Sequence, residues 1–185
     1  MRRKDRQLTD IDDIKEILTR GRIAHIAFFD DKYPHVIPMS YGFEMENGRI
    51  FFYFHSAMEG HKLDLIGKNR SVCIEIECNV EMTEGETACA YGCKYMSFVG
   101  FGSAEILNGD DEKADVLKLF MKCQTGRDFG ISRALPKTLE SEPARRLSGH
   151  KNGKKPRNTT VFLFSFSSRK GKSAFFLSRK SAGIF

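Results

Sequence analysis

The feature that most limits the fold is a run of strand-like segments joined by short turns, with no regular alternation of strands and long helices. Residues 35–43 and 49–55 are predicted strands, and Asn47-Gly48 between them favours a tight hairpin because both residues tolerate positive φ. Strands that follow one another so closely pair antiparallel, since a parallel pair needs a long crossover. The sequence therefore predicts a mainly β fold, an antiparallel barrel with accessory helices.

Further elements complete this barrel. Periodicity predicts a helix with one apolar face that ends before Gly21, and either Thr9 or Asp10 can cap its first turn. More strands are predicted at residues 23–29, 71–77 and 94–107, and more helices at residues 59–68 and 110–122. Residues 79–86 are polar and are predicted to form a loop, while Gly100 and Gly102 indicate a bulge or the close approach of another group.

The charge distribution divides the chain near residue 140. Residues 1–140 hold 19 Lys and Arg against 23 Asp and Glu, whereas residues 141–185 hold 11 against 1. We therefore predict one barrel domain over residues 1–140 and a basic extension over residues 141–185, with one candidate strand at residues 159–166. No periodicity predicts a strand after residue 168. A true extension and an altered reading frame near the 3′ end would each produce such a segment.

Composition excludes several classes of protein. With 41% hydrophobic and 29% charged residues, the chain is typical of folded globular proteins. No apolar stretch reaches the ~18 residues of a membrane span, and the basic N-terminus runs into an acidic helix start, unlike a signal peptide. We therefore expect a cytoplasmic protein. The five cysteines lack the spacing of a zinc site and a secretory leader, so neither a metal site nor a disulfide framework is expected.

The segment that leaves the third predicted strand carries the most informative candidate site. The strand ends at His55, and Ser56 and Ala57 turn the chain toward a helix that contains His61 and Lys62. Free amides at a helix start, a hydroxyl and a lysine ammonium together suit a phosphate group. The alternative is a capped helix with a solvated lysine, and the residues alone favour that alternative.

Two other segments are candidates for contact with a flat heterocycle. Pro38 interrupts a predicted strand and leaves backbone groups free to bond the edge of a ring. Ser97 precedes the two glycines at positions 100 and 102, which would allow a ring to lie close to the backbone. An ordinary edge strand and ordinary core packing explain these segments equally well. No hydrolytic triad, nucleotide-binding glycine loop or framed carboxylate pair is evident.

In combination, these segments resemble the pyridoxamine 5′-phosphate oxidase-like, FMN-binding split-barrel family, and most of all its nitroimidazole-resistance (Nim) branch. The resemblance covers roughly residues 1–128, and it is carried by residues 1–6, 36–42, 53–57, 60–66 and 97–102. It implies a split β-barrel that dimerises and holds FMN in grooves at the subunit interface.

The resemblance also implies roles for individual residues. Ser56, His61 and Lys62 would contact the FMN phosphate, and His55 would lie near the ring or the ribityl chain, where it is the one candidate for a catalytic side chain. Family members with the fullest phosphate clamp carry arginine where His61 stands, so phosphate affinity is expected to fall above about pH 6.5. The implied cofactor-binding residues are Ile37, Pro38, Met39, Ser40, Tyr41, His55, Ser56, Ala57, His61, Lys62 and Ser97.

Three functions remain as hypotheses. The first is an FMN-dependent oxidoreductase that reduces nitroimidazoles, other nitroaromatic compounds or a small metabolite, with NAD(P)H as a candidate reductant. The second is a module that binds FMN, or haem on the same type of barrel, without turnover. The third is polyanion binding by the basic segment, whose net charge is +10. We interpret that segment instead as a solvated extension, and we expect neither nucleic-acid nor membrane binding.

Overall fold

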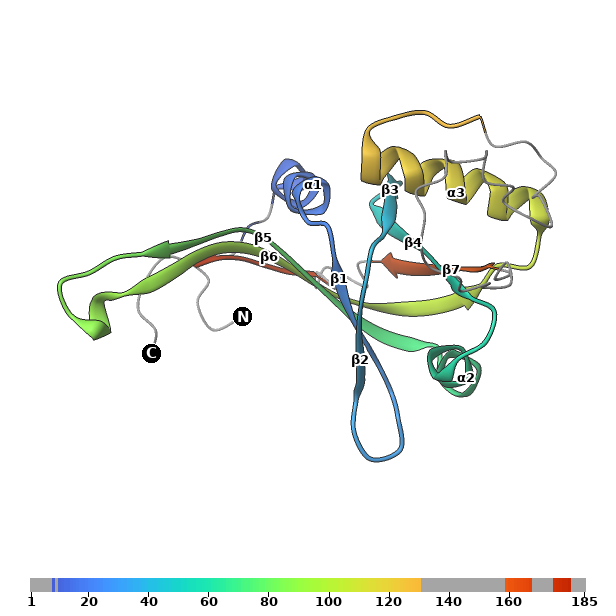
Figure 1. The fold of residues 1–185 in the computed structure, drawn as a ribbon, viewed down its shortest axis with the longest axis horizontal. Coiled ribbons are helices and arrows are strands. Elements are labelled where there is room, and N and C mark those ends of the chain that lie inside the picture. Colours follow the sequence, from blue (N-terminus) through green and yellow to red (C-terminus); the bar gives the residue numbers. More distant parts are fainter. Residues whose placement is uncertain (1–7, 9, 131–158, 168–174, 181–185) are drawn as a thin grey trace, which may run out of the picture.

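The structure, a computed structural model, describes residues 8, 10–130, 159–167 and 175–180 (Figure 1). The predictions made for residues 1–6 and for most of the basic extension lie outside these ranges. The helices are α1 (Ile11–Arg20), α2 (His61–Lys68) and α3 (Asp110–Thr125), with one short 3-10 turn at Ala88–Ala90. The strands are β1 (Ala24–Phe28), β2 (His35–Met39), β3 (Gly42–Glu46), β4 (Arg49–Ala57), β5 (Ser71–Thr83), β6 (Gly92–Ile106), β7 (Thr159–Ser167) and β8 (Phe175–Lys180).

The strands form one antiparallel sheet that curls into a split barrel. Its order is β2-β1-β5-β6-β7-β4-β3, and β8 pairs with β6 beside this path. The two strands at the ends of the path, β2 and β3, are consecutive in the chain, and Met39 and Gly42 can lie no more than about 11 Å apart. The sheet must therefore roll until its ends meet, yet within the described ranges β2 pairs with β1 alone and β3 with β4 alone. The predicted mainly β fold and split barrel are confirmed.

The predicted strand at residues 35–43 is two strands in the structure, because the backbone turns at Ser40 and Tyr41. Tyr41 is 1% exposed, and its hydroxyl lies 2.9 Å from the Leu18 carbonyl oxygen and 3.0 Å from the Gly21 carbonyl oxygen. These carbonyls belong to the end of α1, where they lack partners within the helix. Tyr41 therefore connects α1 to the barrel, and burial raises the pKa of its hydroxyl.

Strands β5 and β6 form a hairpin that projects beyond the barrel, on the left of Figure 1. The predicted loop at residues 79–86 is wrong in its first half, because β5 continues to Thr83 through pairing with β6. The bulge suggested at Gly100 and Gly102 is also absent there, since the register shifts between Cys78 and Glu81 instead. Backbone pairing with β6 explains the longer β5, because it overrides the polar local sequence.

Residues beyond 140 contribute strands to the same sheet. β7 lies between β6 and β4, with Phe164 opposite both Phe52 and Ala104, and Phe164 is fully buried. β8, which the sequence did not predict, pairs with residues 95–100 of β6 on the edge opposite β5. The sheet therefore includes residues on both sides of the charge boundary near residue 140.

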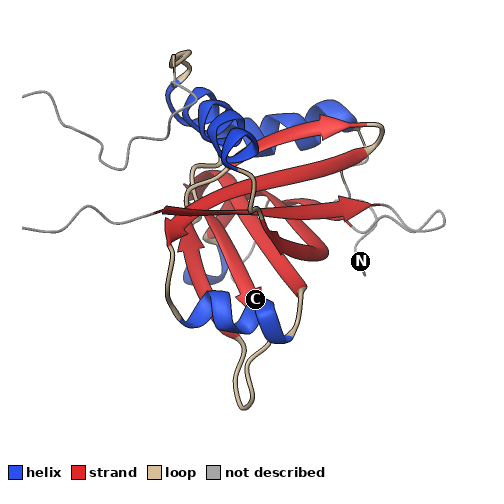
Figure 2. Cartoon of the chain, turned by 90° about the vertical axis from the view of Figure 1, so that its right-hand side faces the viewer, coloured by secondary structure: helices blue, strands red, loops and turns tan. Residues whose placement is uncertain are grey.

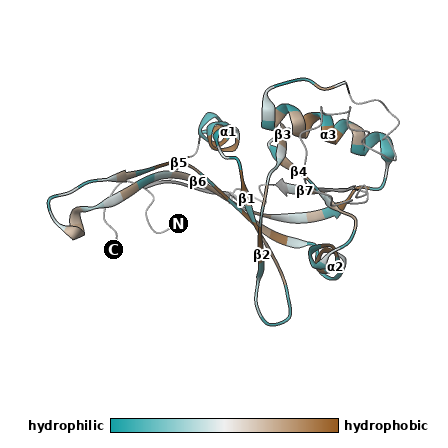
Figure 3. Cartoon of the chain, in the orientation of Figure 1, coloured by the Kyte–Doolittle hydropathy of each residue, from teal (hydrophilic) through white to brown (hydrophobic). Residues whose placement is uncertain are grey.

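The helices cover the barrel on two sides. α1 and α3 lie on one side of the strands and α2 lies on the other (Figures 1 and 2). Figure 3 shows that the crossing strands are largely hydrophobic, whereas the loop between β1 and β2 is hydrophilic. None of the described helices is long and apolar enough to cross a lipid bilayer.

Replacing Gly42 with alanine is expected to lower the free energy of unfolding by about 1–3 kcal/mol, because it overpacks the contact between β3 and α3. A Cβ atom at Gly42 would lie 2.7 Å from the Phe120 Cα atom, which is part of a helix backbone and cannot rotate away. Urea unfolding of both proteins measures the loss. Gly67→Ala in α2 is the control, because a Cβ there meets no atom within 4 Å and helix propensity predicts a small gain. Equal stability of both variants would contradict the close packing of α3.

Candidate functional site

The start of α2 carries the features expected of an anion-binding site. The residue before the helix is Gly60, whose φ of 142° is open to glycine but strained for other residues, and no side chain caps the first turn. The Leu63 amide donates to the Gly60 carbonyl oxygen at 2.9 Å, whereas the amides of His61 and Lys62 have no backbone partner among the described residues. The helix dipole favours a negative charge beside these two amides. Lys62 is half-buried in this turn, and its ammonium forms no ion pair within the described part of the chain.

Ser56 and Ala57 end β4 just before this turn. Ser56 is half-buried, and its hydroxyl donates a hydrogen bond to the Ala57 carbonyl oxygen at 2.9 Å. A hydroxyl keeps acceptor capacity and can rotate to another partner, so this local bond leaves the group usable by a ligand. Ser56 lies five residues before His61, so the end of β4 and the first residues of α2 flank the same turn.

His61 opens α2, but its ring faces a carboxylate that the sequence analysis did not consider. The His61 Nε2 atom lies 2.7 Å from Asp30 Oδ2, and the His35 ring packs edge-on against the His61 ring at 5.0 Å between centroids. The bond to His61 and the Asp31 amide lower the pKa of Asp30, so this carboxylate is ionised. The sequence could not reveal the pairing, because Asp30 follows β1 and lies 31 positions before His61.

The β2 residues expected to line a heterocycle divide between two faces of the strand. Ile37 and Met39 are half-buried and pack against the barrel core, whereas Pro38 and Ser40 are exposed. β2 is also an edge strand within the described ranges, since it pairs with β1 alone. A ring on this strand would therefore meet backbone groups and the exposed face, and Tyr41 reaches the core instead.

His55 and Ser97 lie apart from the start of α2. His55 belongs to the exposed face of β4, and its ring packs edge-on against the Phe120 ring of α3, with 4.6 Å between centroids. Partial burial there lowers the pKa of His55. Ser97 is buried on β6, opposite Glu77 and Ser178. Ser56 thus ends the strand on one side of the turn at residues 58–60, and His61 and Lys62 begin the helix on the other side, whereas His55 packs against α3.

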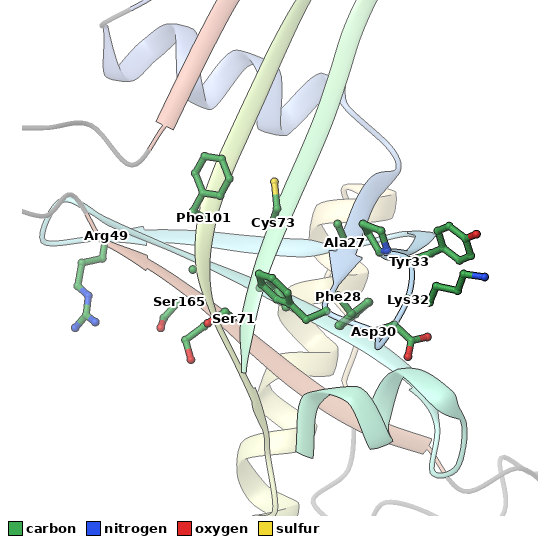
Figure 4. A pocket seen from close by; sticks show the side chains of 15 residues that line it. Ala27, Phe28, Asp30, Lys32, Tyr33, Arg49, Ser71, Cys73, Phe101 and Ser165 are labelled. Carbon is green, nitrogen blue, oxygen red and sulfur yellow. The ribbon is translucent and has the colours of Figure 1, made fainter. Parts of the chain in front are cut away.

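An open groove of about 1130 Å³ lies on the outer face of the sheet next to this turn (Figure 4). Its walls carry three exposed aromatic side chains, Phe29 (63% exposed), Tyr33 (68%) and Phe101 (52%). Asp30 lines the groove and also bonds His61, so the groove ends beside the first residue of α2. None of the cofactor-binding residues predicted from the sequence lines the groove itself.

A second polar cluster lies on the outer face of β1 and β5. His25 Nδ1 lies 3.2 Å from Glu75 Oε2 and 3.8 Å from Glu77 Oε2. Burial, together with the neighbouring Glu77 carboxylate, raises the pKa of Glu75 from an ordinary value of 4.5 to about 7. Glu75 therefore holds a proton at mildly acidic pH, when an ordinary carboxyl would have lost it.

This raised pKa predicts a pH dependence of stability. The native state holds the Glu75 proton more tightly than the unfolded state, so the free energy of unfolding is expected to fall as the pH rises from 4.5 to about 7. Urea unfolding across this range should show a weaker decline for Glu75→Gln than for the native protein. Glu81→Gln, on the same strand, is the control. An unchanged pH profile for Glu75→Gln would contradict the assignment.

Comparisons with known proteins agree with this architecture. A family model described as pyridoxamine 5′-phosphate oxidase matches residues 10–146. No curated protein sequence matches the chain. Among solved structures, a candidate 5-nitroimidazole antibiotic resistance protein from Bacteroides thetaiotaomicron is 21% identical with a TM-score of 0.57, and the match covers 86% of this chain and 87% of that one.

Two other similar structures are named for their cofactors. The flavocytochrome Anf3 from Azotobacter vinelandii is 18% identical with a TM-score of 0.60, over 100% of this chain and 84% of that one. The FAD and heme binding protein from Mycobacterium smegmatis is 12% identical with a TM-score of 0.63, and the match covers 97% of this chain and 76% of that one. At these identities the likeness concerns the fold.

Proposed function

The chain belongs to the pyridoxamine 5′-phosphate oxidase-like family, and from this premise we propose that it is a flavoprotein that binds FMN. The observation that carries the proposal is the start of α2, where no side chain caps the first turn and the half-buried residue Lys62 has no ion-pair partner among the described residues. In this assignment Lys62 and the α2 amides hold the phosphate, Ser56 donates a further hydrogen bond, and His61 contributes when protonated. The Asp30 carboxylate beside His61 repels a dianion, so Lys62 contributes more to phosphate binding than His61 does.

The flavin ring is assigned to residues 37–41, at the end of β2 and just after it, where Pro38 and Ser40 are exposed. Pro38 lacks an amide proton and β2 has one paired edge, which leaves backbone carbonyls and amides to meet the polar edge of a ring. We assign no catalytic role to His55, because its ring packs against Phe120 of α3. Bound FMN would supply hydride and electron transfer, while the chain binds and orients it.

The functional unit is proposed to be a homodimer. Phe29, Tyr33 and Phe101 form an exposed aromatic patch around the groove, and such patches are typical of interaction surfaces. A second copy of the chain that packs on this face would cover the aromatic patch. It would also enclose the flavin ring beside β2, at the open seam of the barrel between β2 and β3. Light scattering of the purified protein should give a mass about twice 21.1 kDa. A monomer at micromolar concentration would contradict this assignment.

The reaction proposed is reduction of a nitroaromatic compound, nitroimidazoles included, at the expense of NAD(P)H. The absorption spectrum of the protein as purified is the first test, because flavin and haem have different bands. Anaerobic NAD(P)H should bleach a flavin spectrum, and a nitroimidazole should restore it. If the oxidised flavin spectrum returns no faster with the nitroimidazole than without it, the protein binds flavin but does not reduce this compound.

A haem spectrum would instead favour the alternative of a haem-binding barrel, a cofactor named for two of the similar structures. Protein that stays colourless after incubation with FMN and with haem would refute both assignments.

A further inference from the structure

We propose that Asp30, His35 and His61 form a binding site for a divalent transition-metal ion, with zinc as the best-fitting ion. The two imidazoles and one carboxylate are ligand types that zinc prefers. One ligand atom from each residue lies within 4.8 Å of the other two. Ligand atoms on a tetrahedral zinc ion are about 3.4 Å apart, so small side-chain rotations complete the site.

The backbone already holds the three residues together. Asp30 follows the end of β1, and His35 opens β2, where it is paired in register with Phe28. His61 is the first residue of α2, which packs against β1. His35 and His61 are therefore held by β2 and α2, and Asp30 lies two residues after the end of β1. Figure 4 shows the Asp30 carboxylate on the side of the groove nearest α2.

Solvent access favours the same assignment. The Asp30 side chain is 28% exposed and the His61 side chain is 52% exposed, so an ion reaches both from solvent. Each neutral imidazole offers a ring nitrogen lone pair to the ion. The ion would also offset the negative charge that Asp30 places beside the anion-binding turn. Zinc binding itself does not require a flavin.

The test is isothermal titration calorimetry at pH 7.5. The untagged full-length protein is first treated with a chelator to remove metal and is then titrated with zinc chloride. One ion per chain is expected at this site. Asp30→Asn and His35→Gln should each weaken zinc binding by about tenfold or more, since even changes outside the ligand set cost that much in metal sites. Asp31→Asn, an exposed carboxylate in the same loop, is the matched control and should bind as the native protein does.

Two variants separate this inference from the proposed flavin site. His35→Gln should weaken zinc binding and leave FMN affinity, measured without metal, unchanged. Lys62→Ala should weaken FMN binding and leave zinc affinity unchanged. Thermal unfolding without metal checks that each variant is folded. Zinc affinity that is equal in the native protein, Asp30→Asn and His35→Gln would overturn the proposal. A loss of zinc affinity in His25→Gln, with native affinity in the other two variants, would also overturn it, because His25 belongs to the separate cluster on β1 and β5.

Discussion

Replacing Phe164 with alanine is expected to lower the free energy of unfolding by about 3–5 kcal/mol. The Phe164 side chain is 0% exposed in the middle of β7, and its ring centroid lies 4.8 Å from that of Phe54 and 6.2 Å from that of Phe28. Truncation removes these contacts and leaves a cavity inside the barrel, which paired strands on both sides of β7 prevent from closing. Urea unfolding followed by circular dichroism measures the loss.

Ser165→Ala is the matched control for this prediction. Ser165 is the next residue of β7 and lines the groove on the outer face, so its truncation should change stability by less than about 0.5 kcal/mol. A similarly small loss for Phe164→Ala would show that β7 does not pack into the barrel core. The comparison matters because β7 follows a basic segment that the sequence separates from the barrel.

The second large effect is expected at Lys62. If FMN binds with its phosphate at the start of α2, Lys62→Ala should weaken FMN binding by about tenfold to a hundredfold, because a hydrogen bond to a charged group contributes about 1.5–3 kcal/mol. Quenching of flavin fluorescence in a titration gives both dissociation constants. The same titration with riboflavin, which lacks the phosphate, should give nearly equal values for the native protein and the variant.

Lys68→Ala provides the charge-matched control, since Lys68 lies in the last turn of the same helix and is exposed. Its removal should leave FMN affinity within about twofold at physiological ionic strength, where screening weakens remote charges. A Lys62→Ala effect that is equal for FMN and riboflavin would place the lysine away from the phosphate. An equal effect of both lysine variants would indicate general attraction rather than a defined contact.

Features encoded by neighbouring residues were predictable. Asp10 caps α1 through a hydrogen bond from the Asp12 amide, as its position before an apolar stripe indicated. The hairpin between β3 and β4 turns at Asn47 and Gly48, both of which have positive φ. Each of these features depends on residues within about one turn, so local propensity decides it.

Predictions that depended on distant partners were less complete. The sequence placed His61 at the start of α2 but gave no sign that Asp30 and His35 would face it. It did not predict β8, because residues 175–180 have no clear apolar alternation. It did not predict that β5 would run on to Thr83, because Val80 and Met82 stand in a largely polar segment. In both cases strand pairing supplies the hydrogen bonds that polar residues would otherwise make with water.

By itself, the sequence determined the mainly β character, the hairpin turns, the helix caps and the segment in which Ser56, His61 and Lys62 lie, because alternation and capping act between near neighbours. Only the tertiary structure decided that β7 lies between β4 and β6, that the buried Tyr41 hydroxyl bonds the end of α1, and that Asp30 and His35 meet His61. Those contacts exist because a sheet whose end strands are consecutive must roll up, and closure brings together residues that no local pattern connects.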